Sequence, residues 1–152
     1  QEVYMSYKQK SVVISLASHI LVLAYFGIKL NQFYKAGPLV PNQVFRLWGV
    51  IIILMILVNI IGNIIANIVS SAIQMAKTNE VEEFVEDERD KVIELKSSRI
   101  AYIINSICVG LAMLTFVLGQ PALLMFNLLI LSGILSGIFE DVFQLVMYRR
   151  GY

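Results

Sequence analysis

Thr78–Arg99 reads T-N-E-V-E-E-F-V-E-D-E-R-D-K-V-I-E-L-K-S-S-R and separates two pairs of long apolar segments. It holds eight of the chain's eleven carboxylates and four of its twelve Lys and Arg residues. We therefore expect this stretch to be the water-exposed module of the chain. It also has the density of ionisable groups that a switch, a cation site or a docking surface needs.

The composition indicates an integral membrane protein of one domain, residues 1–152. Apolar residues make up 58% of the chain and charged residues 15%, against roughly 45–50% and about 25% in soluble proteins. A soluble domain could not cover that much apolar surface. The net charge of +1 gives no field that would attract nucleic acid. The single Cys108 excludes an intrachain disulfide and a cysteine-based metal motif, and no motif indicates a cofactor or a metal.

The apolar runs predict an all-α, four-helix transmembrane bundle with spans at about 12–28, 47–73, 100–118 and 122–146. No A-x-A cleavage pattern follows the first run, so we expect it to stay as a helix. Asn31–Arg46 contains Gly37, Pro38 and Pro41 and is predicted to be a loop. A cytoplasmic helix over about 79–99 is predicted to continue unbroken into the third span.

The distribution of basic residues predicts the orientation. With four spans, the two termini and the charged stretch share one side, which carries nine Lys and Arg residues, whereas the other side carries only Lys29, Lys35 and Arg46. Cytoplasmic segments are enriched in Lys and Arg. We therefore expect a multi-pass protein of the plasma membrane, in contact with the lipid bilayer, with both termini in the cytoplasm.

Asparagines in the second run form a regular stripe at Asn59, Asn63 and Asn67. Residues four apart lie on one helix face, and lipid cannot satisfy amides, so the stripe must face protein or water. It is either a packing surface between helices or the lining of a polar path. His19 in the first run and Asn105 in the third are candidates for the same path, and Asn63 and Asn105 are predicted to meet at similar depth. His19 either bonds to a neighbouring helix or acts as a proton-relay or ligand histidine.

Five carboxylates of the charged stretch form an acidic face. As an ordinary solvated helix face it needs no function, but it is also our candidate partner-docking surface. Divalent cation binding is a further alternative, although the spacing of a calcium-binding loop is absent. The five residues are Glu83, Glu86, Asp87, Asp90 and Glu94.

The third and fourth runs are joined only by Gly119-Gln120-Pro121, which predicts an antiparallel hairpin. Reflection about this turn brings Arg99 to the depth of Asp141, so these two are predicted to pair at the cytoplasmic interface. Lys96 and Glu140 are expected to join them.

The fourth run also contains two overlapping pairs of small residues with the spacing that lets transmembrane helices approach closely. This pattern predicts a helix contact, either inside one chain or in an oligomer. The residues are Ser132, Gly133, Ser136 and Gly137.

Glu86–Arg99 reads E-D-E-R-D-K-V-I-E-L-K-S-S-R, and the chain carries a short basic tail, Tyr148-Arg149-Arg150-Gly151. These features resemble a family of small prokaryotic four-span membrane proteins of unknown function, in which D-E-R-x-x-x-I-x-x-K leads into a span. The resemblance covers about the last half of the chain and implies the four-span architecture. It implies no activity, only an association with small regulators or transporter components.

Two functions follow from these patterns as hypotheses. The first is a non-enzymatic membrane regulator or accessory subunit that docks a cytoplasmic or membrane partner through the acidic face. The second is a small oligomeric transporter or channel with an asparagine-lined path. Either is expected to work as a homo-oligomer or within a larger membrane complex. An enzyme is not expected, because the sequence has no nucleophile motif and no paired catalytic carboxylates in a pocket-like span.

Overall fold

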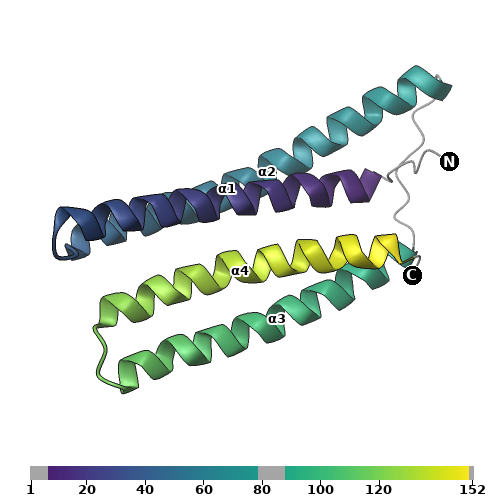
Figure 1. Cartoon of the computed structure of the whole chain (residues 1–152). Helices are drawn as coiled ribbons and strands as arrows, with labels where there is room; N and C mark the ends of the chain where they lie inside the picture. Colours follow the sequence, from purple (N-terminus) through teal and green to yellow (C-terminus); the bar gives the residue numbers. More distant parts are fainter. Residues whose placement is uncertain (1–6, 79–87, 151–152) are drawn as a thin grey trace.

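The computed structural model describes residues 7–78 and 88–150, with the side chains of Tyr7 and of most positions from 59 to 78 outside the description. These residues form four α-helices in the order α1 (Tyr7–Ala36), α2 (Pro41–Thr78), α3 (Glu88–Val117) and α4 (Ala122–Arg149). All four are long and apolar enough to cross a membrane. The predicted all-α bundle of four spans is confirmed, and the chain is a multi-pass membrane protein (Figure 1).

The helices are longer than the predicted spans, and the prediction of a loop over Asn31–Arg46 is wrong. α1 continues to Ala36 and α2 begins at Pro41. Gly37 has φ 134°, a conformation that favours glycine and ends α1. Pro41 occupies the first position of α2, where its missing N–H would have no helical partner in any case. Thirty residues of α1 span about 45 Å, so the helix extends beyond a hydrocarbon core of about 30 Å.

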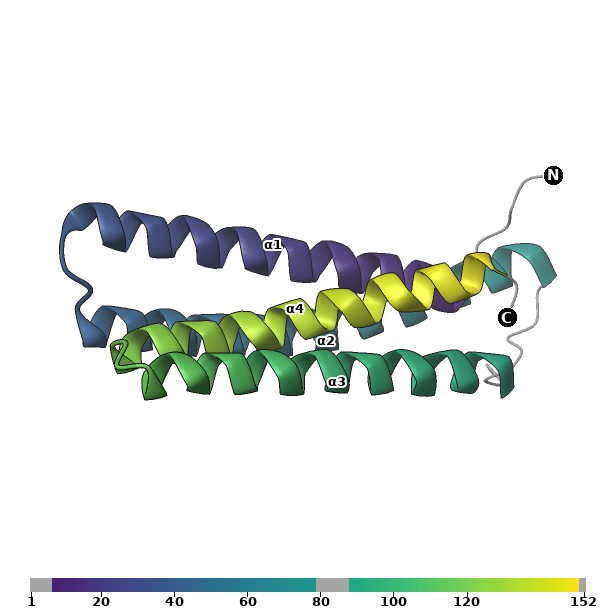
Figure 2. The same cartoon turned by 60° about the horizontal axis from the view of Figure 1, so that its bottom comes forward.

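The helices form two antiparallel hairpins, α1–α2 and α3–α4, and α1 packs against α4 to join them. We call the end with the two hairpin turns the loop end, and the end where α1 and α3 begin and α2 and α4 finish the terminal end (Figures 1 and 2). The second half of α2 leans away from the other helices (Figure 1). α1 and α4 are therefore the central pair of the bundle.

Two buried apolar clusters hold this arrangement together. The loop-end cluster joins α1, α2 and α4 and consists of Val22, Phe26, Leu47, Ile51 and Ile134. The terminal-end cluster joins α1, α3 and α4 and consists of Val12, Ile93, Met147 and Tyr148. The two clusters lie at different levels along the same α1–α4 contact.

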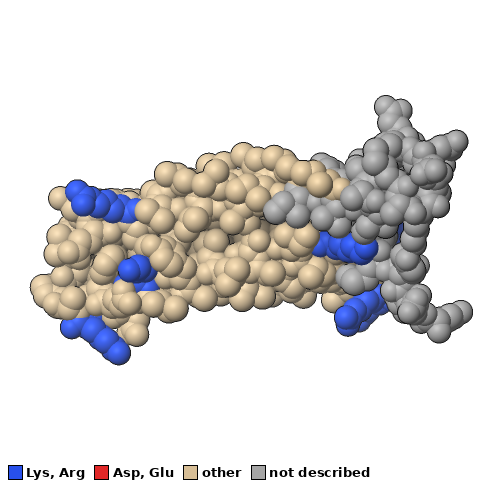
Figure 3. Space-filling model, turned by 90° about the horizontal axis from the view of Figure 1, so that it is seen from above, with Lys and Arg blue, Asp and Glu red and all other residues tan. Residues whose placement is uncertain are grey.

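Most other large apolar side chains point outward. Leu21, Tyr102 and Val117 are 71%, 73% and 77% exposed, which suits side chains that meet lipid. Figure 3 shows the same division on one face, where Lys and Arg side chains lie toward both ends and an uncharged belt lies between them.

Candidate functional site

The chain's single histidine forms a buried polar contact with Asp141 between α1 and α4. His19 Nδ1 lies 2.7 Å from Asp141 Oδ2, and the two side chains are 12% and 8% exposed. When Asp141 is ionised its oxygens only accept, and Nδ1 is then the donor of this hydrogen bond. His19 lies about 18 Å along α1 from Tyr7, and Asp141 lies about 12 Å before the end of α4 at Arg149. Both are therefore inside the spans, where ionisable groups are costly and usually functional.

Two small residues shape the surroundings of His19. A Cβ added at Gly137 would lie 2.7 Å from His19 Nε2, so the missing side chain of this glycine makes room for the imidazole. On the other side of the ring, Ser15 Oγ lies 3.5 Å from Nδ1, one helical turn away on α1. The imidazole is thus held between a carboxylate, a hydroxyl and a notch in α4.

This contact corrects the prediction that Asp141 pairs with Arg99. Arg99 is exposed and forms no ion pair with any residue in 7–78 or 88–150. The reason is the direction of the side chains, because successive helical residues point about 100° apart. Glu140 faces α3 and accepts a hydrogen bond from Ser98, whereas Asp141 is turned toward α1.

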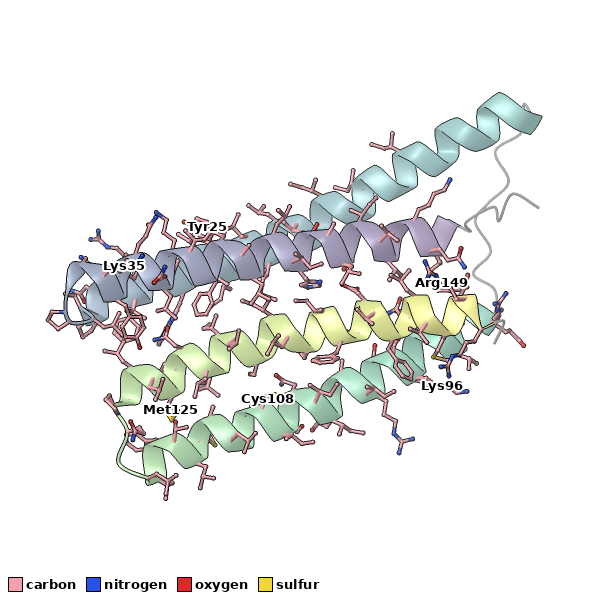
Figure 4. The ribbon with its side chains drawn as sticks, in the orientation of Figure 1. Tyr25, Lys35, Lys96, Cys108, Met125 and Arg149 are labelled. Carbon is pink, nitrogen blue, oxygen red and sulfur yellow. The ribbon has the colours of Figure 1, made fainter. Side chains whose placement is uncertain are left out.

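The residues of α3 and α4 that lie at the same level of the hairpin are nevertheless close to those predicted. Ser98 contacts Glu140, and two turns nearer the terminal end Tyr148 donates a hydrogen bond of 2.9 Å to Asp90. Gly119, with φ 80°, starts the turn. Lys96 and Arg149 both lie toward the terminal end (Figure 4).

Two carboxylates of the predicted acidic face have partners inside the chain. Asp90 is bound by Tyr148 of α4, and Glu94 pairs with Lys8 of α1 at 2.9 Å, with Glu94 55% exposed. These contacts attach the start of α3 to its neighbours. Glu83, Glu86 and Asp87 lie outside the described residues, so the docking surface stays a prediction.

The predicted polar stripe is only partly described. Asn59, Asn63 and Asn67 belong to α2, but their side chains lie outside the description, and Asn105 is half-buried on α3. The predicted contact between Asn63 and Asn105 therefore stays a prediction. His19 belongs to the α1–α4 contact with Asp141.

The small residues of α4 divide into different roles. Gly137 accommodates His19, whereas a Cβ at Gly133 would meet nothing within 4 Å. Ser132 and Ser136 donate to the backbone carbonyls of Leu129 and Gly133. The close approach inside the chain thus occurs at Gly137.

A second buried polar contact lies at the loop end and was not predicted. Asn127 is 5% exposed and accepts a hydrogen bond of 3.1 Å from Trp48 Nε1, while its own amide donates to the carbonyl of Leu123. Phe45 and Phe126 pack against the indole ring. The sequence signal for this contact is the single Trp48 near the start of a span, because a buried indole N–H needs a hydrogen-bond partner.

Among the side chains described, no three His, Cys, Asp or Glu residues gather as they would around a metal ion. Comparison of the chain with protein-family models, curated proteins and solved structures finds no match. The resemblance to small prokaryotic four-span proteins therefore stays a prediction. The candidate site rests on the chain's own geometry, which singles out His19 and Asp141 in the membrane and the start of α3 at the terminal end.

Proposed function

We propose that the chain is a non-enzymatic regulator or accessory subunit of the plasma membrane. Its termini and the segment between α2 and α3 would face the cytoplasm, as the nine Lys and Arg residues on that side favour. A protein partner would dock on the acidic face formed by Glu83, Glu86, Asp87, Asp90 and Glu94.

The observation that carries this proposal is the continuity of α3. The helix runs from Glu88 to Val117 without a break, so it joins the second half of the charged stretch, from Glu88 onward, to the apolar run of the third span. Asp90 is bound to α4 and Glu94 to α1. A partner that displaces either contact would change how the start of α3 is attached to α1 or α4.

A partner that binds Asp90 or Glu94 must first displace the residue that already contacts that carboxylate. Asp90 would have to leave Tyr148, and Glu94 would have to leave Lys8. Such an exchange of partners is what a regulator needs, because binding then favours one packing of the helices over another.

A small oligomeric transporter or channel is the second candidate. The buried His19–Asp141 pair favours it, since ionisable side chains inside spans commonly mark ion and proton pathways. In that case the stripe of Asn59, Asn63 and Asn67 would line the path together with these residues.

The test replaces Glu83, Glu86 and Asp87 by Gln, Gln and Asn and measures which proteins co-purify with the full chain from its own membranes. The control replaces Glu82 and Glu88 by Gln, which removes charge from the same segment at positions about 100° or more around the predicted helix from Glu83. We expect the first variant to lose a partner that the control keeps.

Two results would contradict the docking proposal. One is equal co-purification in both variants. The other is normal host behaviour in both, combined with loss of function when Asn59 and Asn63 are replaced by Leu. The second result would favour the transporter.

A further inference from the structure

We propose that the loop end of the bundle binds anionic phospholipids of the leaflet around it, and that Lys29, Lys35 and Arg46 contact the lipid phosphates. This goes beyond the docking function, because it assigns a ligand to the end of the molecule opposite the acidic face. It also requires no protein partner, so it stands or falls separately from that function.

The loop end carries three positive charges and no negative one. The chain has no Asp or Glu in residues 3–79 or 95–139, which include both hairpin turns and the helix ends that flank them. The basic residues of this end are Lys29, Lys35 and Arg46. On the face drawn in Figure 3, blue side chains lie at the loop end and no red one accompanies them.

These three cations have no counter-charge within the chain. None forms a hydrogen bond or an ion pair with a residue that the structure describes. Asp141 is bonded to His19, which precedes Lys29 by ten residues on α1, so this carboxylate lies about 15 Å away along the helix axis. That distance exceeds the Debye length of about 8 Å in physiological salt. At the terminal end, by contrast, Lys8 has Glu94 at 2.9 Å.

The level of these side chains along the bundle identifies the missing anion as a lipid phosphate. Lys29 lies about 10 Å before the end of α1 at Ala36, and Arg46 lies about 8 Å after the start of α2 at Pro41. Because α1 and α2 are antiparallel, the two cations are at nearly the same level. Lys29 also directly follows the apolar run 12–28, so both lie at the edge of the hydrocarbon core, where the headgroups begin.

Exposed aromatic side chains lie beside two of the cations. Tyr34 precedes Lys35 and is 56% exposed, and Phe45 precedes Arg46 and is 49% exposed. Aromatic residues are typical of the headgroup level, and Figure 4 shows Lys35 at this end of α1. The loop end therefore presents basic and aromatic groups together at the membrane surface.

The excess of positive charge predicts a preference among lipids. A zwitterionic headgroup carries its own cation beside the phosphate, whereas an anionic headgroup does not. Each Lys or Arg near an anionic leaflet strengthens binding by about fivefold. We therefore expect phosphatidylglycerol to bind at the loop end in preference to phosphatidylcholine.

Trp48 is the chain's single tryptophan and lies at the level of Lys29, so its fluorescence reports on lipids at this end. The full-length chain is reconstituted in phosphatidylcholine vesicles that contain increasing fractions of brominated phosphatidylglycerol or, in parallel, brominated phosphatidylcholine, whose bromine atoms quench tryptophan on contact. We expect an affinity for phosphatidylglycerol about fivefold higher or more. Equal quenching by the two lipids would overturn the proposal.

Charge variants test the assigned residues. Lys29→Gln combined with Arg46→Gln should remove most of the preference for phosphatidylglycerol, whereas Lys29→Arg keeps the charge and should retain it. Lys10→Gln is the matched control, because it removes one charge from the other end of α1, and it should leave the preference unchanged. An unchanged Trp48 emission maximum in phosphatidylcholine alone checks that each variant is folded.

Two further outcomes would contradict the assignment. One is an equal loss of preference in Lys10→Gln and Lys29→Gln, which would show that the effect depends on net charge and not on the loop end. The other is competition by inorganic phosphate at constant ionic strength, which would assign the cations to a free anion instead of a lipid.

Discussion

Glu140 and Asp141 are adjacent in the sequence, yet they contact different helices. Glu140 is bound by Ser98 of α3, and Asp141 is bound by His19 of α1. At the scale of the residue, the two side chains point about 100° apart around α4. This difference in direction decides that Asp141, and not Glu140, faces α1. The buried carboxylate is the one that has a titratable partner.

The first prediction concerns the energy of this contact. Replacing either His19 or Asp141 by Leu leaves one polar group alone between apolar layers, so each change should strongly destabilise the bundle, by about 3–5 kcal/mol if it behaves like other buried pairs. Replacing both should cost clearly less than the sum of the two. The measurement is unfolding by SDS in mixed micelles, followed by the fluorescence of Trp48. Additive losses would show that the two residues do not interact.

The second prediction concerns Arg99, which is exposed and separate from Asp141. Arg99→Gln should change the free energy of unfolding by no more than about 0.5 kcal/mol, as is usual for a surface position. A loss as large as that of Asp141→Leu in the same assay would restore the ion pair expected from the sequence.

These residues also show what sequence reasoning can predict about the site. The depth of Asp141 and its need for a partner followed from the short α3–α4 turn. The identity of the partner did not, because it depends on which helix packs against the inward face of α4, and apolar periodicity does not contain that information. His19 is a candidate from the sequence because it is an ionisable group in an apolar run. Its contact with Asp141 could not be predicted in the same way.

At the scale of the element, α3 and α4 form a hairpin whose alignment is fixed by Gly119-Gln120-Pro121 and by polar contacts at the far end. The short turn made this alignment predictable. The end of α1 and the start of α2 were less predictable, because the Gly and Pro residues and exposed polar side chains between them suggest a longer loop. Pro41 instead starts a helix, and only the four residues 37–40 separate α1 from α2.

The third prediction tests the hairpin alignment by disulfide cross-linking. In a Cys108→Ser background, cysteines that replace Ser98 and Glu140 should cross-link under mild oxidation, because these two side chains are in contact. A cysteine at Tyr102 with one at Glu140 is the control, since Tyr102 is 73% exposed and lies one turn further along α3. Cross-linking of the control pair with equal yield would contradict the alignment.

At the scale of the whole molecule, the chain is a membrane bundle with its charge concentrated at one end. The composition and the four apolar runs made this architecture predictable. The lean of α2 away from the bundle was not, because an apolar surface meets lipid and protein equally well and no pattern distinguishes them. The sequence also could not show that α1 and α4 form the central contact, and this contact creates the candidate site.

The proposed docking function requires the segment before α3 to lie in the cytoplasm. Single cysteines at Lys35, near the loop end, and at Glu83, in a Cys108→Ser background, would be labelled in intact cells with a membrane-impermeant maleimide. We expect labelling at position 35 without permeabilisation and at position 83 only after it. Labelling of position 83 in intact cells, with position 35 protected, would reverse the orientation and remove the basis for a cytoplasmic partner.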